Sequence, residues 1–382
     1  MAPPPLPEEM VEEILLRFPP DDPARLVHAA LVCKPWCAIL SGAGFRRRFG
    51  KLHRAPPLLG FVSNVRIQPD RMAPEFVPTC SMPASHIPVY SRMGRVVDAH
   101  HGRVLLHRIS GGWGLPTSNV LMVWDPTTDE QEEVPIPAVA RYTHTHNWTA
   151  AVLCAAGGHC DHLDCRRGPY SIVFVGYDQT HFETVLCTYS SSTASWSKPI
   201  SSNQVLDCHY MSTHVAHVES ALYFGVLKKT DHILKFDLES QQISWIQTPA
   251  ACSNGRPYVL TTTEGGGLGV AAIHESSKLY MWSRDDVSQV DATWTQSRVI
   301  DLKTLLPVHA VLDSPRVLGF TVGTGVIFVK SNNVLFVIDL KTYKVIKEVS
   351  KPRDIYTIVP YMSFYTPGTT LLSFRFCSIL DE

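Results

Sequence analysis

The residues of this 382-residue chain that can bind a metal or act as nucleophiles include ten cysteines and 17 histidines. Their densest group is "HCDHLDC", which runs from His159 to Cys165. Cys160 and Cys165, with His159 or His162, could in principle bind Zn²⁺ tetrahedrally. Four ligands so close in sequence are sterically awkward, and the flanking "AAGG" and "RRGP" are typical of a loop between two strands. We therefore expect an exposed loop, with no metal and no other cofactor.

A second pair of thiols lies in "LVCKPWCAIL", where Cys33 and Cys37 are separated by three residues. This spacing is one residue longer than that of a thioredoxin-type pair, and no short C-x-x-C pair lies nearby to complete a zinc site. The remaining cysteines are scattered without the spacing of a disulfide framework. This distribution is typical of free, packed thiols in a cytosolic or nuclear protein.

The sequence contains none of the motifs that would predict catalysis. G-x-S-x-G and H-E-x-x-H are both absent, and "EGGGLG" at 264–269 lacks the lysine and hydroxyl of a phosphate-binding loop. The basic stretch "FRRRFGKLHR" at 45–54 could contact phosphates, but the net charge of -1 favours a solvated surface. We expect a non-enzyme that binds neither nucleic acid nor membrane and that is cytoplasmic, nuclear or both.

The segment before residue 50 has helical periodicity. An apolar stripe recurs at i, i+1, i+4, i+5 and i+8, with glutamates opposite. Its members are Met10, Val11, Ile14, Leu15 and Phe18. "PPDD" at 19–22 predicts the end of this helix, Asp22 and Pro23 predict the start of a second, and Pro35 predicts the start of a third that carries Trp36. Three such helices bury too little surface to be stable alone, so they pack either on a partner or on the rest of the chain.

These residues resemble the F-box, and in detail the F-box of the large plant families. The matching elements are Leu6-Pro7, the acidic helix ending in Ile14-Leu15, the turn at Leu26, "LVCK-x-W" at 31–36, and Phe45 with its arginines. Cys37 departs from the pattern, because a basic residue is usual there, and Phe18 stands where leucine is usual. The resemblance implies docking to a Skp-family adaptor and, through it, to a cullin. The side chains that it implies at the adaptor are Leu6, Pro7, Met10, Ile14, Leu15, Leu26, Leu31, Val32, Cys33 and Trp36.

After the connector "RAPPLL" at 54–59, the pattern becomes that of strands. An apolar strand runs into a D/S-x-x-S/T/D turn five times, at intervals of 46 to 65 residues, and a further apolar strand precedes each. The marker residues are Asp125, Ser190, Asp237, Ser283 and Asp339. Four antiparallel strands repeating in this way predict propeller blades. "LLGFV" near 60 and "IYTIVPYMSFYT" near the C-terminus can pair as a sixth blade that closes the ring.

The fold class is therefore an α+β multidomain protein, with a three-helix F-box before an all-β propeller of about six blades. We place the F-box at 1–54, a linker at 55–60 and the propeller at 61–382. The second region also resembles the F-box-associated propeller-type domains of plant F-box proteins, in "HRAPPLLGFV", "HHGRVLLHR" at 100–108, "VWDPTT" at 123–128 and "GPYSIVFV" at 168–175.

The two resemblances imply a substrate-recognition subunit of an SCF-type ubiquitin ligase, whose propeller binds a protein target that the sequence does not identify. Two alternatives stay open. One is an F-box scaffold or regulator outside a cullin complex, and the other is a propeller enzyme or lectin with a helical cap.

Overall fold

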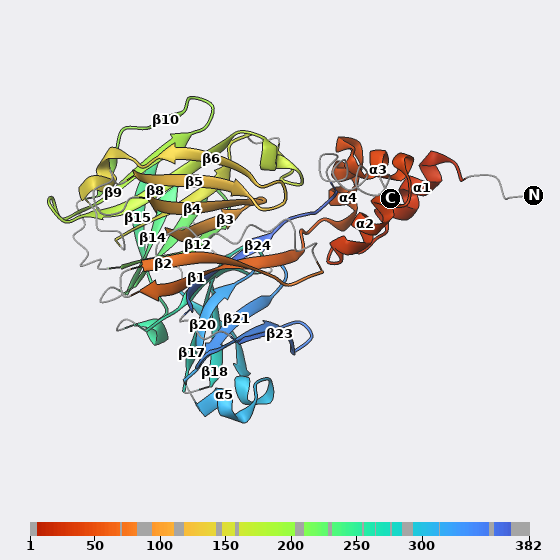
Figure 1. Ribbon diagram of the computed structural model, residues 1–382. Coiled ribbons are helices and arrows are strands. Elements are labelled where there is room, and N and C mark those ends of the chain that lie inside the picture. Colours follow the sequence, from red (N-terminus) through yellow and green to blue (C-terminus); the bar gives the residue numbers. More distant parts are fainter. Residues whose placement is uncertain are drawn as a thin grey trace, which may run out of the picture.

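The structure is a computed structural model in which helices lie beside a β-propeller (Figure 1). It describes residues 6–68, 71–81, 94–110, 118–142, 147–156, 160–202, 210–227, 231–253, 256–263, 265–275, 277–284, 293–312, 314–350 and 355–367. Among these residues, no helix combines the length and the apolar character that a membrane span requires.

The N-terminal region forms four helices around a small apolar core. They are α1 (Glu8–Leu16), α2 (Pro23–Ala30), α3 (Lys34–Ser41) and α4 (Ala43–His53). The buried core comprises Val11, Leu15, Leu16, Leu26, Ala29, Ala30, Leu40, Phe45 and Phe49. Prolines stand at the start of α2 and α3, where a missing N–H costs no helical hydrogen bond.

The fourth helix corrects the three-helix prediction. Phe45 and Phe49 stack with ring centroids 5.7 Å apart, one turn apart on α4, and both are buried. Their i, i+4 spacing is the sequence signal for this helix, which the basic residues between them hide. Asp22 occupies the N-cap position of α2, but its carboxylate accepts from Arg25 Nε (2.9 Å) and caps no helix N–H.

The rest of the described chain forms six antiparallel sheets. Blade 1 is β3 (Gly94–His100), β4 (Arg103–Ser110), β5 (Ser118–Asp125) and β6 (Glu130–Pro135). Blade 2 is β7 (Trp148–Cys154), β8 (Tyr170–Asp178) and β9 (Glu183–Ser190), whose outer edge pairs with both β10 (Ser195–Trp196) and β11 (Ile200–Ser202). Blade 3 is β12 (Tyr210–Val218), β13 (Ala221–Leu227), β14 (His232–Asp237) and β15 (Gln242–Gln247).

Blade 4 is β16 (Val259–Thr262), β17 (Leu268–His274), β18 (Lys278–Arg284) and β19 (Thr295–Asp301). A short helix, α5 (Val308–Leu312), leads into blade 5, which is β20 (Arg316–Phe320), β21 (Val326–Ser331), β22 (Val334–Asp339) and β23 (Lys344–Ser350). Blade 6 is β24 (Ile355–Met362) with β1 (Leu58–Gln68) and β2 (Arg71–Pro78).

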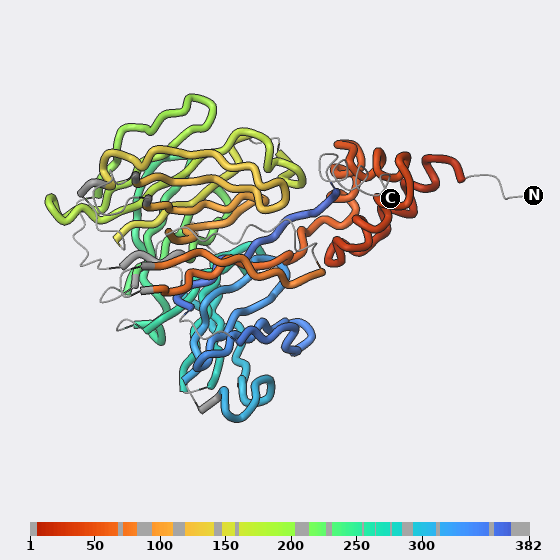
Figure 2. The backbone as a smooth tube through the Cα atoms, in the orientation of Figure 1, coloured from red at the N-terminus to blue at the C-terminus, as the bar shows by residue number. Residues whose placement is uncertain are grey.

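The sixth blade confirms the predicted ring closure. β24 pairs antiparallel with β1, with Phe61 opposite Pro360 and Val62 opposite Val359. β24 also contacts β20 on one side and β3 on the other, so both ends of the propeller chain meet in one sheet. Two ends of a repeat that pair in this way leave no open edge between them. The last described residues then run out of the propeller toward the helices (Figure 2).

The turn chemistry that marks the repeat is confirmed at its three aspartates. Oδ1 of Asp125 accepts from the N–H of Thr127 (2.8 Å). Asp237 and Asp339 accept in the same way from backbone N–H groups two or three residues on. Each turn therefore closes the hairpin between the third and fourth strands of its blade.

The propeller core consists of apolar clusters between neighbouring blades. Among the described residues there is one such cluster for each of the six pairs of adjacent blades. Trp148 and Phe174, stacked with centroids 5.1 Å apart, belong to the cluster between blades 1 and 2. Each blade therefore packs against a neighbouring blade on both of its faces.

Candidate functional site: the helical face, the joint and the central cavity

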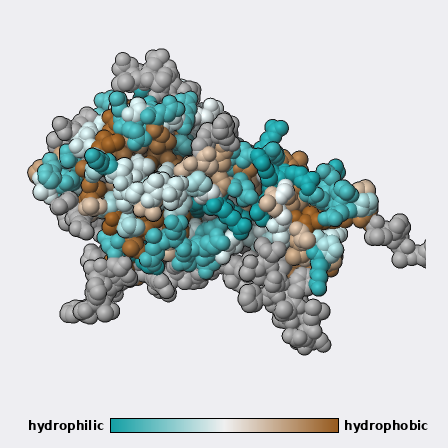
Figure 3. Space-filling model, turned by 90° about the horizontal axis from the view of Figure 1, so that it is seen from above, coloured by the Kyte–Doolittle hydropathy of each residue, from teal (hydrophilic) through white to brown (hydrophobic). Residues whose placement is uncertain are grey.

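The helical region exposes a set of large apolar side chains. The exposed fractions are 56% for Leu6, 54% for Met10, 48% for Ile14 and 64% for Val32. In Figure 3, brown hydrophobic atoms lie among teal ones at the end of the molecule that carries the helices. Met10 and Ile14 are one turn apart on α1, so they share a face.

Four other predicted adaptor residues are exposed or half-buried. Pro7 is exposed, whereas Leu31, Cys33 and Trp36 are half-buried. Leu31 and Trp36 pack in part against the helical core. Their remaining surface is available to a partner.

Two of the predicted adaptor residues are in the interior. Leu15 is 0% exposed and Leu26 is 1% exposed, and both belong to the core of the helical region. Neither side chain reaches the surface, so the prediction that they contact an adaptor is wrong for this arrangement of the helices. They support the exposed face from below.

The helices are joined to the propeller by an aromatic contact. Phe364, which follows β24, packs on the helical core with its ring edge-on to Phe49, at a centroid distance of 5.9 Å. On the other side of the linker, Val27 of α2 packs against the cluster between blades 6 and 1. The joint is therefore apolar at two separate points.

A loop of blade 2 makes the polar part of the joint. Nε of Arg46 on α4 donates to the carboxylate of Asp164 at 3.2 Å. Arg47 lies 3.7 Å from the carboxylate of Asp161. Leu163, between the two acids, packs so closely on Gly50 that a Cβ added there would be 3.2 Å from Cβ of Leu163.

A cavity of about 430 Å³ occupies the centre of the propeller beneath this joint. The innermost strands of all six blades line it, namely β3, β7, β12, β16, β20 and β24. The loop at 161–166 and residues 54–56 of the linker lie at its mouth. This cavity is the central channel of the ring, covered on one side by the helical region.

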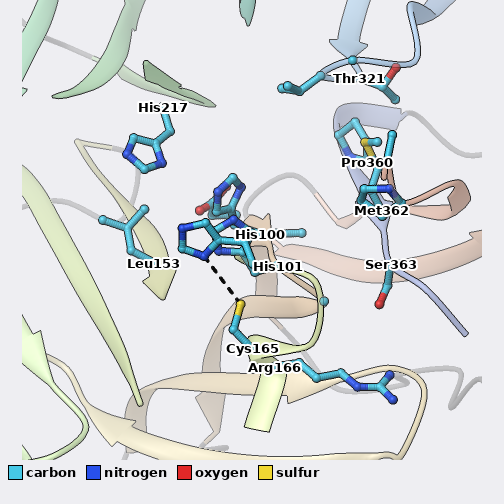
Figure 4. A pocket seen from close by; sticks show the side chains of 18 of the residues that line it. His100, His101, Leu153, Cys165, Arg166, His217, Thr321, Pro360, Met362 and Ser363 are labelled. Carbon is cyan, nitrogen blue, oxygen red and sulfur yellow. Dashed lines mark hydrogen bonds between the residues drawn. The ribbon is translucent and has the colours of Figure 1, made fainter. Parts of the chain in front are cut away.

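Histidines gather on one side of the cavity. Figure 4 shows His100, His101 and His217 there, with Thr321, Pro360 and Met362 opposite. The rings of His100 and His101 lie 3.9 Å apart, centroid to centroid. Burial, aided by the neighbouring imidazoles, lowers the pKa of His100 to about 3 and also lowers the pKa of His101 and His217. These imidazoles are neutral at pH 7.

Two further titratable groups line the channel. Burial raises the pKa of Asp98 to about 6, against the opposing effect of its hydrogen bond from the N–H of Val152 (2.9 Å). Nε2 of His214 lies 2.7 Å from the carbonyl of Leu318, and burial lowers the pKa of His214.

The loop at the cavity mouth brings its candidate ligands next to one residue that the sequence did not group with them, Cys154. Three thiols and one imidazole, from Cys154, Cys160, His162 and Cys165, place their ligand atoms within 4.8 Å of one another. Cys154 ends β7 and was missed, because its proximity to Cys165 depends on the pairing of β7 with β8. His159, the other predicted candidate, lies outside the described residues.

Comparison with known families decides what these two regions are. The F-box domain model matches residues 5–48, and the model described as "F-box protein AT5G49610-like, beta-propeller" matches residues 95–368. The chain belongs to this family of F-box β-propeller proteins. The exposed helical set is therefore a face of an F-box, hereafter the F-box face (Leu6, Met10, Ile14 and Val32). A search of curated proteins gives no match.

Solved propellers resemble the chain only distantly. The allergen Mala s 1 of Malassezia sympodialis matches with a TM-score of 0.40 and 10% identity, over 67% of this chain and 78% of its own. The WD40 domain of SCAP from fission yeast gives 0.37 and 11%, over 69% and 57%. A luciferin-regenerating enzyme gives 0.35 and 12%, over 81% and 97%. Likenesses this weak carry no argument about function.

Proposed function

We propose that the protein is the substrate-recognition subunit of an SCF-type ubiquitin ligase. Its F-box binds a Skp-family adaptor and, through it, a cullin, and its propeller holds a protein target for ubiquitination. The protein itself is non-catalytic, and the transfer chemistry belongs to other subunits.

The F-box face carries this proposal. Four large apolar side chains, each about half exposed or more, lie on a domain of only four short helices. A water-exposed patch of this kind is a mark of a protein interface. A few apolar side chains that become buried usually dominate the binding energy of such an interface. Met10 and Ile14, which share an exposed face of α1, would be two of them.

The contacts at the joint support a receptor role. The aromatic contact of Phe364 with the F-box core and the ion pair of Arg46 with Asp164 fix the F-box on one side of the ring. A receptor must present its target at a set distance from the ligase machinery, and a fixed joint does this. Among the described residues, three carboxylates line the channel: Asp98 on β3, and Asp161 and Asp164 of the mouth loop, which face Arg47 and Arg46 of α4.

The proposal is tested by affinity purification of the tagged full chain from cells in which degradation is blocked. We expect the adaptor and the cullin to co-purify with the wild-type chain. Ile14→Asp should lose both. Ile346→Asp is the matched control, because Ile346 is 54% exposed, close to the 48% of Ile14, but lies on β23 of the propeller. That variant should keep both partners.

Other outcomes distinguish the alternatives. Recovery of the adaptor without cullin would favour a scaffold or regulator over a ligase subunit. Recovery of neither partner by the wild-type chain would contradict the proposal and leave the F-box helices as a cap of the propeller.

A further inference from the structure

We propose that Cys154, Cys160, His162 and Cys165 form a tetrahedral Zn²⁺ site that fastens the loop of blade 2 at the joint between propeller and F-box. The inference rests on side-chain geometry and does not depend on the proposed ligase function. It replaces the expectation, drawn from sequence alone, of a metal-free loop.

The distances fit a metal of this kind. Metal–sulfur bonds of about 2.3 Å in a tetrahedron place two sulfurs about 3.8 Å apart. Sγ of Cys154 and Sγ of Cys160 are 3.7 Å apart. Sγ of Cys165 and Nδ1 of His162 are 3.8 Å apart. All four ligand atoms lie within 4.8 Å of one another, so small shifts bring them around one ion.

The donor set selects zinc. Three thiolates with one imidazole form one of the common structural zinc sites, and four protein ligands leave no open position for catalysis. Zn²⁺ with these ligands carries a net charge of about -1. Arg103, only 3% exposed, donates to the carbonyl of Cys165 (2.7 Å) and brings a compensating positive charge to the site.

The imidazole of His162, an exposed residue, contacts a neighbouring ring. The ring of His162 stacks on the ring of His101, with centroids 4.3 Å apart and planes 7° apart. His162 has a φ of 54°, a conformation that few non-glycine residues adopt. The stacking and the backbone conformation both limit the orientations of the imidazole before a metal binds, and the side chains that bind metals are commonly oriented by their neighbours.

The position of the site gives it a structural consequence. Cys154 belongs to β7, whereas Cys160, His162 and Cys165 belong to the loop whose Asp161, Leu163 and Asp164 contact α4. A metal that binds both segments fixes the loop on the propeller and, through it, the orientation of the F-box. Loss of the metal should loosen the joint.

The test is the metal content of the purified full chain, dialysed against a weak chelator and measured by elemental analysis. We expect about one zinc per folded chain, released when a mercurial reagent blocks the thiols. The Co²⁺-exchanged chain should show the thiolate charge-transfer and visible d–d bands of a tetrahedral site. Cys165→Ser should bind zinc at least about tenfold more weakly, since the loss of even a hydrogen-bonding partner of a metal ligand commonly costs about that much affinity. Cys252→Ser, which alters another buried cysteine, should bind zinc as the wild type does.

Measurements on the wild-type chain keep the proposal falsifiable even if Cys165→Ser fails to fold. A folded wild-type chain with no bound zinc would overturn the proposal. So would a disulfide between Cys154 and Cys160 found by mass spectrometry of the intact chain. Zinc that Cys252→Ser loses as readily as Cys165→Ser would also contradict this assignment of the ligands.

The structural consequence has its own readout, hydrogen exchange in α4 and in the linker. We expect faster exchange there after zinc removal and recovery when zinc is restored. Unchanged exchange in a chain that has lost its zinc would refute the role of the site at the joint.

Discussion

Truncation of two adjacent residues of α1 should change the folding free energy by very different amounts. Leu15 is 0% exposed in the core of the F-box, whereas Ile14 is 48% exposed on the F-box face. Successive helical residues point about 100° apart, which is enough to place one inside and the next outside.

The cost of Leu15→Ala can be worked from its burial. A fully buried leucine replaced by alanine costs about 3 kcal/mol or more, because its transfer free energy is lost and a cavity remains. Ile14→Ala removes a side chain that is already half in water, and alanine has the better helix propensity, so the net change in folding free energy should be below about 0.5 kcal/mol.

Amide hydrogen exchange in α1 and α4 measures this difference within the full chain, where the propeller would obscure a global unfolding curve. A loss of about 3 kcal/mol corresponds to exchange about 100-fold faster in the F-box helices. We expect this for Leu15→Ala and near wild-type exchange for Ile14→Ala. Equal acceleration by the two variants would refute the assignment of one residue to the core and the other to the surface.

Three further predictions concern the propeller and the joint. Asp125→Ala should cost about 2 kcal/mol, because it leaves the buried N–H and hydroxyl of Thr127 without their acceptor, whereas the same change at the more exposed Asp237 should cost about 1 kcal/mol. Urea unfolding compares the two variants, and equal costs would argue against a larger contribution from the buried turn. Burial lowers the pKa of His214 below its ordinary value of about 6.5, so as the pH falls through that value the unfolded chain binds more protons than the folded chain and the folded state loses stability. His214→Asn should therefore flatten the fall in unfolding free energy between about pH 7 and pH 5. An unchanged slope would contradict the burial of a neutral His214. Phe364→Ala should loosen the F-box on the propeller, and protease cleavage within residues 54–57 should become faster. Cleavage at the wild-type rate would show that the contact between Phe364 and Phe49 contributes little to the joint.

The strands of the propeller follow from period and turn chemistry. "YSIVFVGYD" is β8, and "ALYFGVL" is β13. The sixth blade is predictable because an apolar strand segment is left over at each end of the repeat. Pairing the two segments, β1 and β24, covers the strand edges that both would otherwise expose.

The orientation of α1 is not predictable in the same way. Its apolar stripe is wide enough to include both the F-box core and the F-box face, since both need the same residue types. Only the packing of α3 and α4 on α1 decides that Leu15 points inward and Ile14 outward.

The four proposed zinc ligands could not be grouped from the sequence for a different reason. Cys160, His162 and Cys165 are close along the chain. Cys154 lies near them only because the antiparallel pairing of β7 with β8 brings the two ends of the connecting loop together, with Cys154 opposite Tyr170. The pairing of strands can bring together metal ligands that are separated in sequence, so a short sequence motif can contain only three of the four ligands.

The central claim is that the F-box face binds a Skp-family adaptor, and its most direct test is the Kd of the purified full chain for that adaptor by calorimetry. Ile14→Asp loses about 1 kcal/mol of apolar burial and places a carboxylate in the interface at a cost of at least about 2 kcal/mol, so the account predicts an affinity about 100-fold weaker. Ile346→Asp should bind as the wild type does. A wild-type chain that does not bind the adaptor, or an Ile14→Asp chain that binds it with undiminished affinity, would contradict the account.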